Sequence, residues 1–244
     1  MTATRIVSAT LSRRSFLATS AATGALALSG CASLDRGGSF QEAPGARPQF
    51  GVDPAFAAYA EMYGARIDEG YEVPAIPIDK VDRRNYRQIV SDPTGERPGT
   101  IVVDTSNHFL YFVREGGEAI RYGVGLGREG FAWSGRAVVQ WKRKWPTWTP
   151  PTEMIKRQPE LEKYSAANGG MQPGLDNPLG ARALYIFQNK EDTLYRIHGS
   201  PEWWTIGKSV SSGCVRMMNQ DVMDLYDRVP NKTPILVTSG LAVS

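Results

Sequence analysis

From residue 100 onward, apolar residues come in short runs separated by turn-forming residues, a pattern that predicts β-strands. Ile101–Val103 and Phe109–Val113 flank a polar Ser-Asn turn, which predicts a hairpin. Ala183–Phe187 and Thr193–His198 predict a second hairpin in the same way. The remaining predicted strands are 118–124, 137–141 and 234–238. We therefore expect a mainly β domain over residues 97–240, with a few short helices.

Helical spacing of apolar residues occurs in three places. Asp53-Pro54 is expected to open a helix that stops at Gly64, and Asn219 is expected to cap a helix whose apolar face ends at Val229. A short helix is predicted around Thr152–Gln158, inside a proline-containing segment (142–180) that is too long for a simple connection and is expected to carry function. Residues 53–96 are expected to form the first helix and then an irregular extension.

The first thirty residues are typical of an export signal. Arg13-Arg14 precede Phe16-Leu17 and an apolar run of small residues, which resembles a twin-arginine signal, although a general secretory signal containing Arg-Arg is the other interpretation. Leu28–Cys31 resembles a bacterial lipobox in which Cys31 is the lipid attachment point, the other interpretation being a chance cysteine near an ordinary cleavage site. Both interpretations predict an exported protein of the periplasm or cell envelope, anchored to a membrane if Cys31 is lipidated. Residues 31–52 are rich in Gly, Pro, Ser and Ala and are expected to be a flexible tether.

The net charge of the chain changes when residues 1–30 are excluded. The 244 residues carry 28 Lys and Arg against 25 Asp and Glu, and three of the arginines lie in residues 1–30, which contain no acidic residue. The remaining 25 basic and 25 acidic residues cancel. The domain therefore has no bulk positive charge with which to bind nucleic acid. Two Cys and two His also exclude a disulfide scaffold and argue against a structural zinc site.

One segment combines the chain's reactive residue types. His198 ends a predicted strand, and Cys214 follows 16 residues later in a Ser-Ser-Gly turn. A thiol on such a turn is exposed to substrate, the backbone N–H groups of the turn can face a developing oxyanion, and a histidine within hydrogen-bond reach gives a reactive thiolate. A small buried cysteine with an unrelated strand-end histidine would have the same residue types.

The order of residues in this segment favours a reactive Cys–His pair over a buried cysteine with an unrelated histidine. His198-Gly199, a loop, and then Ser211–Met217 (Ser-Ser-Gly-Cys-Val-Arg-Met) strongly resemble the active-site motif of the L,D-transpeptidase family, with its YkuD-type catalytic domain. The resemblance covers about residues 100–238 and includes Val103–Thr105 and Asn177–Gly180. Many members have histidine where this chain has Ser212. This difference is expected to alter the hydrogen bonding of the loop or the substrate preference, and not the chemistry.

The resemblance implies a β-sandwich-like domain and a role for each motif residue. Cys214 is implied as the nucleophile that forms a thioester with a peptidoglycan stem peptide, and His198 as its base. The backbone carbonyl of Gly199 or Ser200 would orient the histidine, and the N–H groups of Gly213 and Cys214 would form the oxyanion hole. Arg216 either binds a stem carboxylate or holds the loop through an ion pair. Further substrate contacts are expected from Ser212, Tyr185 and Trp203.

The implied activity is the formation of 3→3 cross-links between two stem peptides, with no metal or organic cofactor and no nucleic acid partner. The same acyl-enzyme would serve hydrolysis, exchange, or attachment of an envelope protein to peptidoglycan. A catalytically silent lipoprotein that binds peptidoglycan is the interpretation from another class. The protein is expected to be a monomer.

Overall fold

The computed structural model describes residues 54–127, 134–211 and 213–241. The predicted export signal (1–30), the lipid attachment point Cys31, the tether (31–52) and Ser212 lie outside the described residues. Within the described ranges, no helix has the length and apolar composition that a membrane crossing requires.

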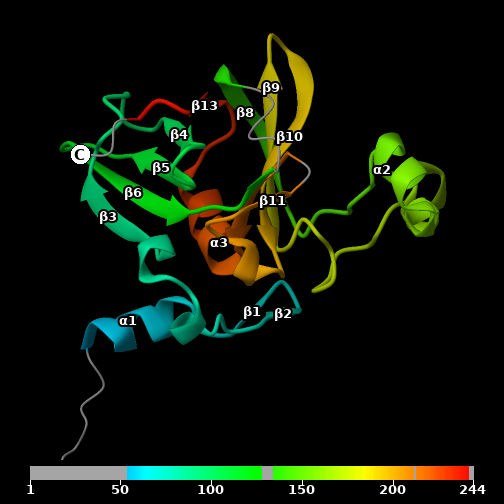
Figure 1. The fold of residues 1–244 in the computed structure, drawn as a ribbon, viewed down its shortest axis with the longest axis horizontal. Helices are drawn as coiled ribbons and strands as arrows, with labels where there is room; N and C mark the ends of the chain where they lie inside the picture. The colour runs from blue at the N-terminus through cyan, green and yellow to red at the C-terminus, as the bar shows by residue number, and fades with distance from the viewer. Residues whose placement is uncertain (1–53, 128–133, 212, 242–244) are drawn as a thin grey trace, which may run out of the picture. The chain divides into compact units, whose positions relative to one another are not determined.

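A nine-stranded mixed sheet dominates the domain (Figure 1). Two neighbouring pairs are parallel, β10 with β12 and β13 with β4, and the others are antiparallel. The mainly β prediction is confirmed. Across the sheet the strands lie in the order β12 (Val215–Met218), β10 (Glu191–Ser200), β9 (Arg182–Gln188), β8 (Gly135–Lys144), β13 (Thr233–Thr238), β4 (Ile101–Asp104), β5 (Phe109–Val113), β6 (Glu118–Gly123) and β3 (Gln88–Ser91).

Both predicted hairpins are confirmed by the strand register. Val103 pairs with Leu110 in the first hairpin, and Ala183 pairs with His198 in the second. A separate two-stranded parallel sheet joins β7 (Leu126–Gly127) to β11 (Ser209–Ser211). This small sheet ties the middle of the chain to the segment that leads to Cys214.

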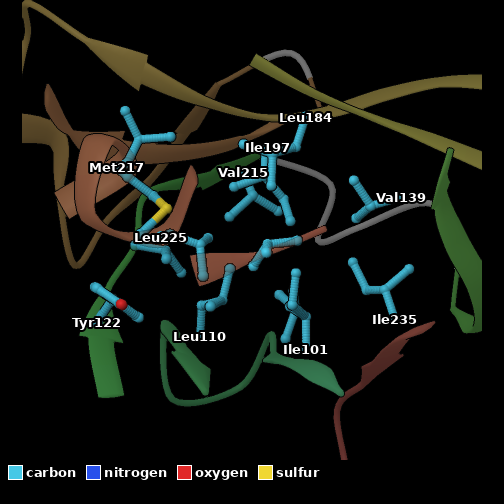
Figure 2. Packing of buried hydrophobic residues seen from close by; sticks show 14 of the residues in the cluster. Ile101, Leu110, Tyr122, Val139, Leu184, Ile197, Val215, Met217, Leu225 and Ile235 are labelled. Carbon is cyan, nitrogen blue, oxygen red and sulfur yellow. The ribbon is translucent and has the colours of Figure 1, made fainter. Parts of the chain in front are cut away.

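Helix α3 (Asn219–Arg228) lies between the two halves of the large sheet (Figure 1). It packs on β9, β10 and β12, while the Tyr122 hydroxyl on β6 donates a hydrogen bond of 2.6 Å to the Asp224 carboxylate of the helix. The sheet therefore bends around the helix, as in a sandwich with one helix in its core. Figure 2 shows side chains from both halves of the sheet meeting Leu225 of α3 in this core.

The segment before residue 98 is more ordered than its proline-containing sequence predicts. After α1 (Pro54–Met62), it forms the hairpin β1 (Arg66–Asp68) and β2 (Tyr71–Val73), two 3₁₀ turns (Ile78–Lys80 and Arg83–Asn85), and then the edge strand β3. The Tyr63 hydroxyl donates to Asp221 of α3 at 3.2 Å, and Gln220 Nε2 donates to the Pro74 carbonyl at 2.8 Å. The extension predicted to be irregular is thus fixed to α3 and adds a strand to the sheet.

A buried ion pair also fixes this segment to the domain. Arg182 on β9 is only 2% exposed, and its guanidinium bonds both oxygens of Asp68 at 2.8 and 3.0 Å. The Trp145 indole donates to the same carboxylate at 2.7 Å. Hydrogen bonds from Arg182 hold the pKa of Asp68 below its usual value.

We predict that Asp68→Ala lowers the free energy of unfolding by about 3–5 kcal/mol, because it leaves a buried guanidinium without its counter-ion. Urea denaturation measures this difference. The neighbouring Glu69 forms an ion pair with Lys144 at 2.6 Å, but both side chains are more than 40% exposed. The matched control Glu69→Gln should therefore cost no more than about 1 kcal/mol, and equal losses in the two variants would contradict the assignment.

Candidate active site

A cavity of about 1050 Å³ opens beside the end of β10. His198 and Ser200 of β10 line one side, together with Gly213, Cys214 and Arg216. The segment expected from its length to be functional supplies another wall. Its predicted helix is confirmed as α2 (Thr152–Arg157), followed by 3₁₀ turns at Pro159–Tyr164 and Ala166–Asn168. The residues of this segment that line the cavity are Trp148, Met154, Arg157, Gln158, Leu161, Tyr164, Met171, Asp176, Pro178 and Leu179.

Strand pairing brings the two ends of the motif together. In the parallel pair of β10 and β12, His198 lies opposite Arg216, and Ile197 lies opposite Val215. Side chains alternate between the faces of a sheet, so the buried Ile197 and Val215 point into the core while His198 and Arg216 share the opposite face. Cys214 directly precedes β12, and it lines the same cavity as His198. The topology, rather than the sequence separation of 16 residues, makes them neighbours of one cavity.

Glycine is required directly before the cysteine. Gly213 has φ of +125°, a backbone conformation that other residues rarely adopt. A Cβ at this position would also lie 2.9 Å from the Tyr195 ring. The tight turn that presents Cys214 therefore depends on the absence of a side chain at 213.

The structure fixes the tautomer of His198. Its ring is 4% exposed, and Nδ1 lies 2.6 Å from the carbonyl oxygen of Gly199. A carbonyl only accepts a hydrogen bond, so Nδ1 carries the proton and Nε2 keeps its lone pair. Burial, the largest cause, lowers the pKa of His198 to about 4, against the raising effects of backbone hydrogen bonds at Gly199 and Pro178. The imidazole is therefore neutral at physiological pH and able to accept a proton.

The thiol is also uncharged in this environment. Burial raises the pKa of Cys214 above its usual value, although a backbone hydrogen bond at Arg196 and the positive charges of Arg196 and Arg216 act in the opposite direction. The residue is half-buried at the cavity. The sequence predicts a thiolate here, whereas the structure favours a neutral thiol and a neutral imidazole. At Cys214 desolvation outweighs the nearby positive charges, and at His198 the charges of Arg196 and Arg216 act in the same direction as desolvation.

Asn219 has a different role from the one predicted. The sequence predicts an N-cap, but Met218 occupies that position and Asn219 is the first residue of α3. Its Oδ1 accepts a hydrogen bond from the Ala181 N–H at 3.0 Å, and a Cβ on either Gly180 or Gly199 would overlap that oxygen. Asn219 thus packs directly against the backbone that orients His198. A helix-start asparagine looks the same in the sequence whether it caps or packs.

The other predicted substrate contacts divide between two places. Arg216 lines the cavity, and its Nη1 bonds Glu202 Oε2 at 2.5 Å. Tyr185 does not line the cavity, because its ring stacks on Trp141 at 3.5 Å between centroids. Trp203 packs with the buried cluster around Tyr63 and lines a separate cavity. Of these three residues, the structure therefore places Arg216, but neither Tyr185 nor Trp203, in the cavity that Cys214 lines.

Within the part of the chain that the structure describes, no group of three or more His, Cys, Asp or Glu side chains is arranged to hold a metal ion. The chemistry that the cavity's own residues offer is acyl transfer. A neutral imidazole, a thiol and the glycine that precedes the thiol all line it.

Comparison with known proteins gives the same chemistry. Residues 98–237 match the family model described as the YkuD L,D-transpeptidase catalytic domain. The chain is 34% identical over 144 residues to the probable L,D-transpeptidase YbiS of Escherichia coli K12. This match covers 55% of this chain and 43% of that protein. It is 32% identical over 151 residues to the probable L,D-transpeptidase ErfK/SrfK of the same organism, covering 59% and 45%. The chain thus spans less than half the length of these two relatives.

A solved structure from Brucella melitensis, named a probable carnitine operon oxidoreductase caia, is 45% identical. The match covers 67% of this chain and 95% of that one, with a TM-score of 0.45. A likeness below a TM-score of 0.5 does not decide between functions, so the family rests on the sequence matches.

Proposed function

Because the chain belongs to the family of L,D-transpeptidases with a YkuD-type catalytic domain, we propose that it forms 3→3 cross-links between peptidoglycan stem peptides. The observation that carries the proposal is the His198 imidazole. It is neutral, its proton is fixed on Nδ1 by Gly199, and it lines the same cavity as Cys214. This is the state that a general base needs before it activates a thiol.

The reaction proceeds in two acyl transfers. The Cys214 sulfur attacks the carbonyl carbon of the third stem residue while Nε2 of His198 takes the thiol proton. The N–H groups of Gly213 and Cys214 stabilise the resulting oxyanion. His198 then returns the proton to the amine of the terminal D-alanine, which leaves, and a thioester remains. An amine of a second stem attacks the thioester, His198 takes its proton, and the thiol is restored.

A neutral thiol and a neutral imidazole suit these two acyl transfers. A thiol that loses its proton only as it attacks needs no stable ion pair in the resting site, and the raised pKa of Cys214 and lowered pKa of His198 both favour that state. Orientation of the imidazole by a backbone carbonyl replaces the carboxylate of other triads. We assign Gly199, rather than Ser200, to this role, on the 2.6 Å separation.

Arg216 has two candidate roles, and its contact favours one. The ion pair with Glu202 joins β12 to the segment that follows β10, which supports a role in holding the loop. A stem carboxylate would have to share Arg216 with Glu202 or displace Glu202 from it. Ser212 is a further proposed substrate contact, because it lies two residues before the nucleophile in the sequence.

The remaining proposals concern location. The Arg13-Arg14 signal and the Leu28–Cys31 sequence support export to the periplasm or cell envelope with lipid attachment at Cys31. Residues 31–52 would then tether the domain, whose proposed catalytic part spans 97–240. Such a location places the active site where peptidoglycan lies.

The test uses the wild-type protein and two tetrapeptide stems analysed by mass spectrometry. One reaction contains only a donor stem whose side-chain amine is acetylated, and the other also contains a stem with a free amine. We expect a dimer lacking one D-alanine only in the second reaction. Tripeptide and free D-alanine in both reactions, without dimer, would instead indicate hydrolysis. Intact stems in both reactions would contradict any acyl transfer and leave only peptidoglycan binding.

A further inference from the structure

A second cavity, of about 550 Å³, is lined by residues that follow directly in sequence on those of the first. Trp203 and Trp204 of the 3₁₀ turn Trp203–Thr205 (η5) line it, together with Ile206–Lys208. Ser200–Glu202 and Gly213 line the cavity of Cys214. Both cavities are therefore built on the one segment that connects His198 to Cys214. The mechanism described above leaves the second cavity unused.

The charge lining this cavity is mostly positive. Lys80, Arg84 and Lys208 line it, and within residues 54–127, 134–211 and 213–241 none of the three forms an ion pair with a carboxylate. Arg84 donates instead to the Asn107 carbonyl at 3.3 Å. One acidic residue, Asp82, lines the cavity, and its carboxylate accepts the backbone N–H of Arg84 at 3.0 Å. Three cations without counter-ions suit an anionic ligand.

Asn85 adds a buried polar group with unused hydrogen-bonding capacity. It lines the cavity, is 6% exposed, and its Oδ1 has no hydrogen-bond partner. It lies between two glycines, since a Cβ on Gly207 would be 2.7 Å from its Nδ2 and one on Gly123 would be 2.7 Å from its Cα. A buried amide oxygen without a partner is unfavourable, so a ligand that donates a hydrogen bond to it gains affinity.

The exposed ring of Trp204 supplies an apolar surface. It is 52% exposed, meets Trp203 edge to face at 5.6 Å, and lines the cavity. A large indole at the mouth of a polar, cationic cavity offers contact to a methyl group or an aliphatic chain. The cavity thus combines positive charge, an amide that both donates and accepts, and one apolar face.

We propose that this second cavity binds the terminal carboxylate of the acceptor stem peptide. The cations would bind the carboxylate, Asn85 the neighbouring peptide group, and Trp204 the methyl group of the terminal D-alanine. The inference rests on the proposed function, from which it takes a second stem as ligand. It assigns the acceptor a site of its own, on the segment that carries the nucleophile.

The test measures binding to Cys214→Ala, which cannot form a thioester. The probe is an N-acetylated stem tetrapeptide with lysine as its third residue and its D-glutamate amidated, so that the terminal D-alanine carries the single carboxylate. Isothermal titration calorimetry should show saturable binding that weakens about tenfold or more when Lys208→Glu is added. The indole N–H resonance of Trp204, assigned from Trp204→Phe, should shift on titration of the parent and not of the Lys208→Glu protein.

The matched control is Lys190→Glu, which makes the same charge change in the exposed β9–β10 turn. We expect Lys190→Glu to bind the peptide as the parent does, and unchanged melting temperatures will show that each variant is folded. A peptide with an amidated C-terminus should lose the Lys208-dependent part of the binding. Inorganic phosphate should not displace the peptide at equal concentration, since a site for any small anion would lack the contacts of Asn85 and Trp204.

Three outcomes would overturn the inference. They are equal binding by the parent and Lys208→Glu, equal binding of the amidated peptide, and full displacement by phosphate. Donor acylation of the wild-type protein, measured separately by intact mass, distinguishes failure of this inference from failure of the proposed function. Acylation without Lys208-dependent binding removes the acceptor site alone.

Discussion

Cys214→Ala is expected to abolish acyl transfer, with D-alanine release from a donor stem falling at least about 10⁴-fold. The reason is that alanine cannot form the thioester through which both half-reactions pass. Incubation with a carbapenem should add the inhibitor's mass to the wild-type protein and nothing to the variant. The side chain is half-buried and small, so stability should change by no more than about 1 kcal/mol.

The chain contains a natural control for this substitution. Cys31 is the other of the two cysteines in the sequence and lies outside the domain that carries the cavity. Cys31→Ala should keep the carbapenem adduct and the release of D-alanine at wild-type levels. D-Alanine release by Cys214→Ala, or an adduct that disappears with Cys31, would overturn the assignment of the nucleophile.

Local patterns predicted most of the strands. The hairpin at 101–113 has two apolar runs around a polar turn, and both of its strands pack in the interior. Strand β3 was not predicted, because it is a four-residue edge strand in a segment where prolines dominate the pattern. Its partner β6 also lies about 30 residues further along the chain. Short edge strands depend on pairing that a sequence pattern does not contain.

The candidate site, like the fold, could be predicted from local sequence only in part. His198 and Cys214 belong to one contiguous motif, so they could be proposed as site residues without any knowledge of the fold. The packing of Asn219 against Gly199 and the pairing of Asp68 with Arg182 join residues that are far apart in the chain. No local periodicity encodes such contacts. The neutral state of the Cys214 thiol also depends on burial, which residue type alone does not give.

His198→Asn is expected to slow donor acylation about 10³-fold at pH 7, because the thiol loses its general base. The asparagine amide can still donate to the Gly199 carbonyl, so the change removes proton transfer with little change in packing. The pH profile identifies the role. With burial holding the pKa of His198 at about 4, the wild-type rate should stay level from about pH 5 until the thiol itself ionises.

The variant should behave differently, because only the ionised thiol then reacts. Its rate should rise about tenfold per pH unit up to the pKa of Cys214, so the penalty shrinks as pH rises. Alkylation by iodoacetamide, which needs no substrate, should have the same slope in the variant and thereby separates thiol ionisation from stem binding. A level profile in the variant would remove His198 as the base. An inflection near pH 6.5 in the wild-type protein would contradict the neutral, buried imidazole.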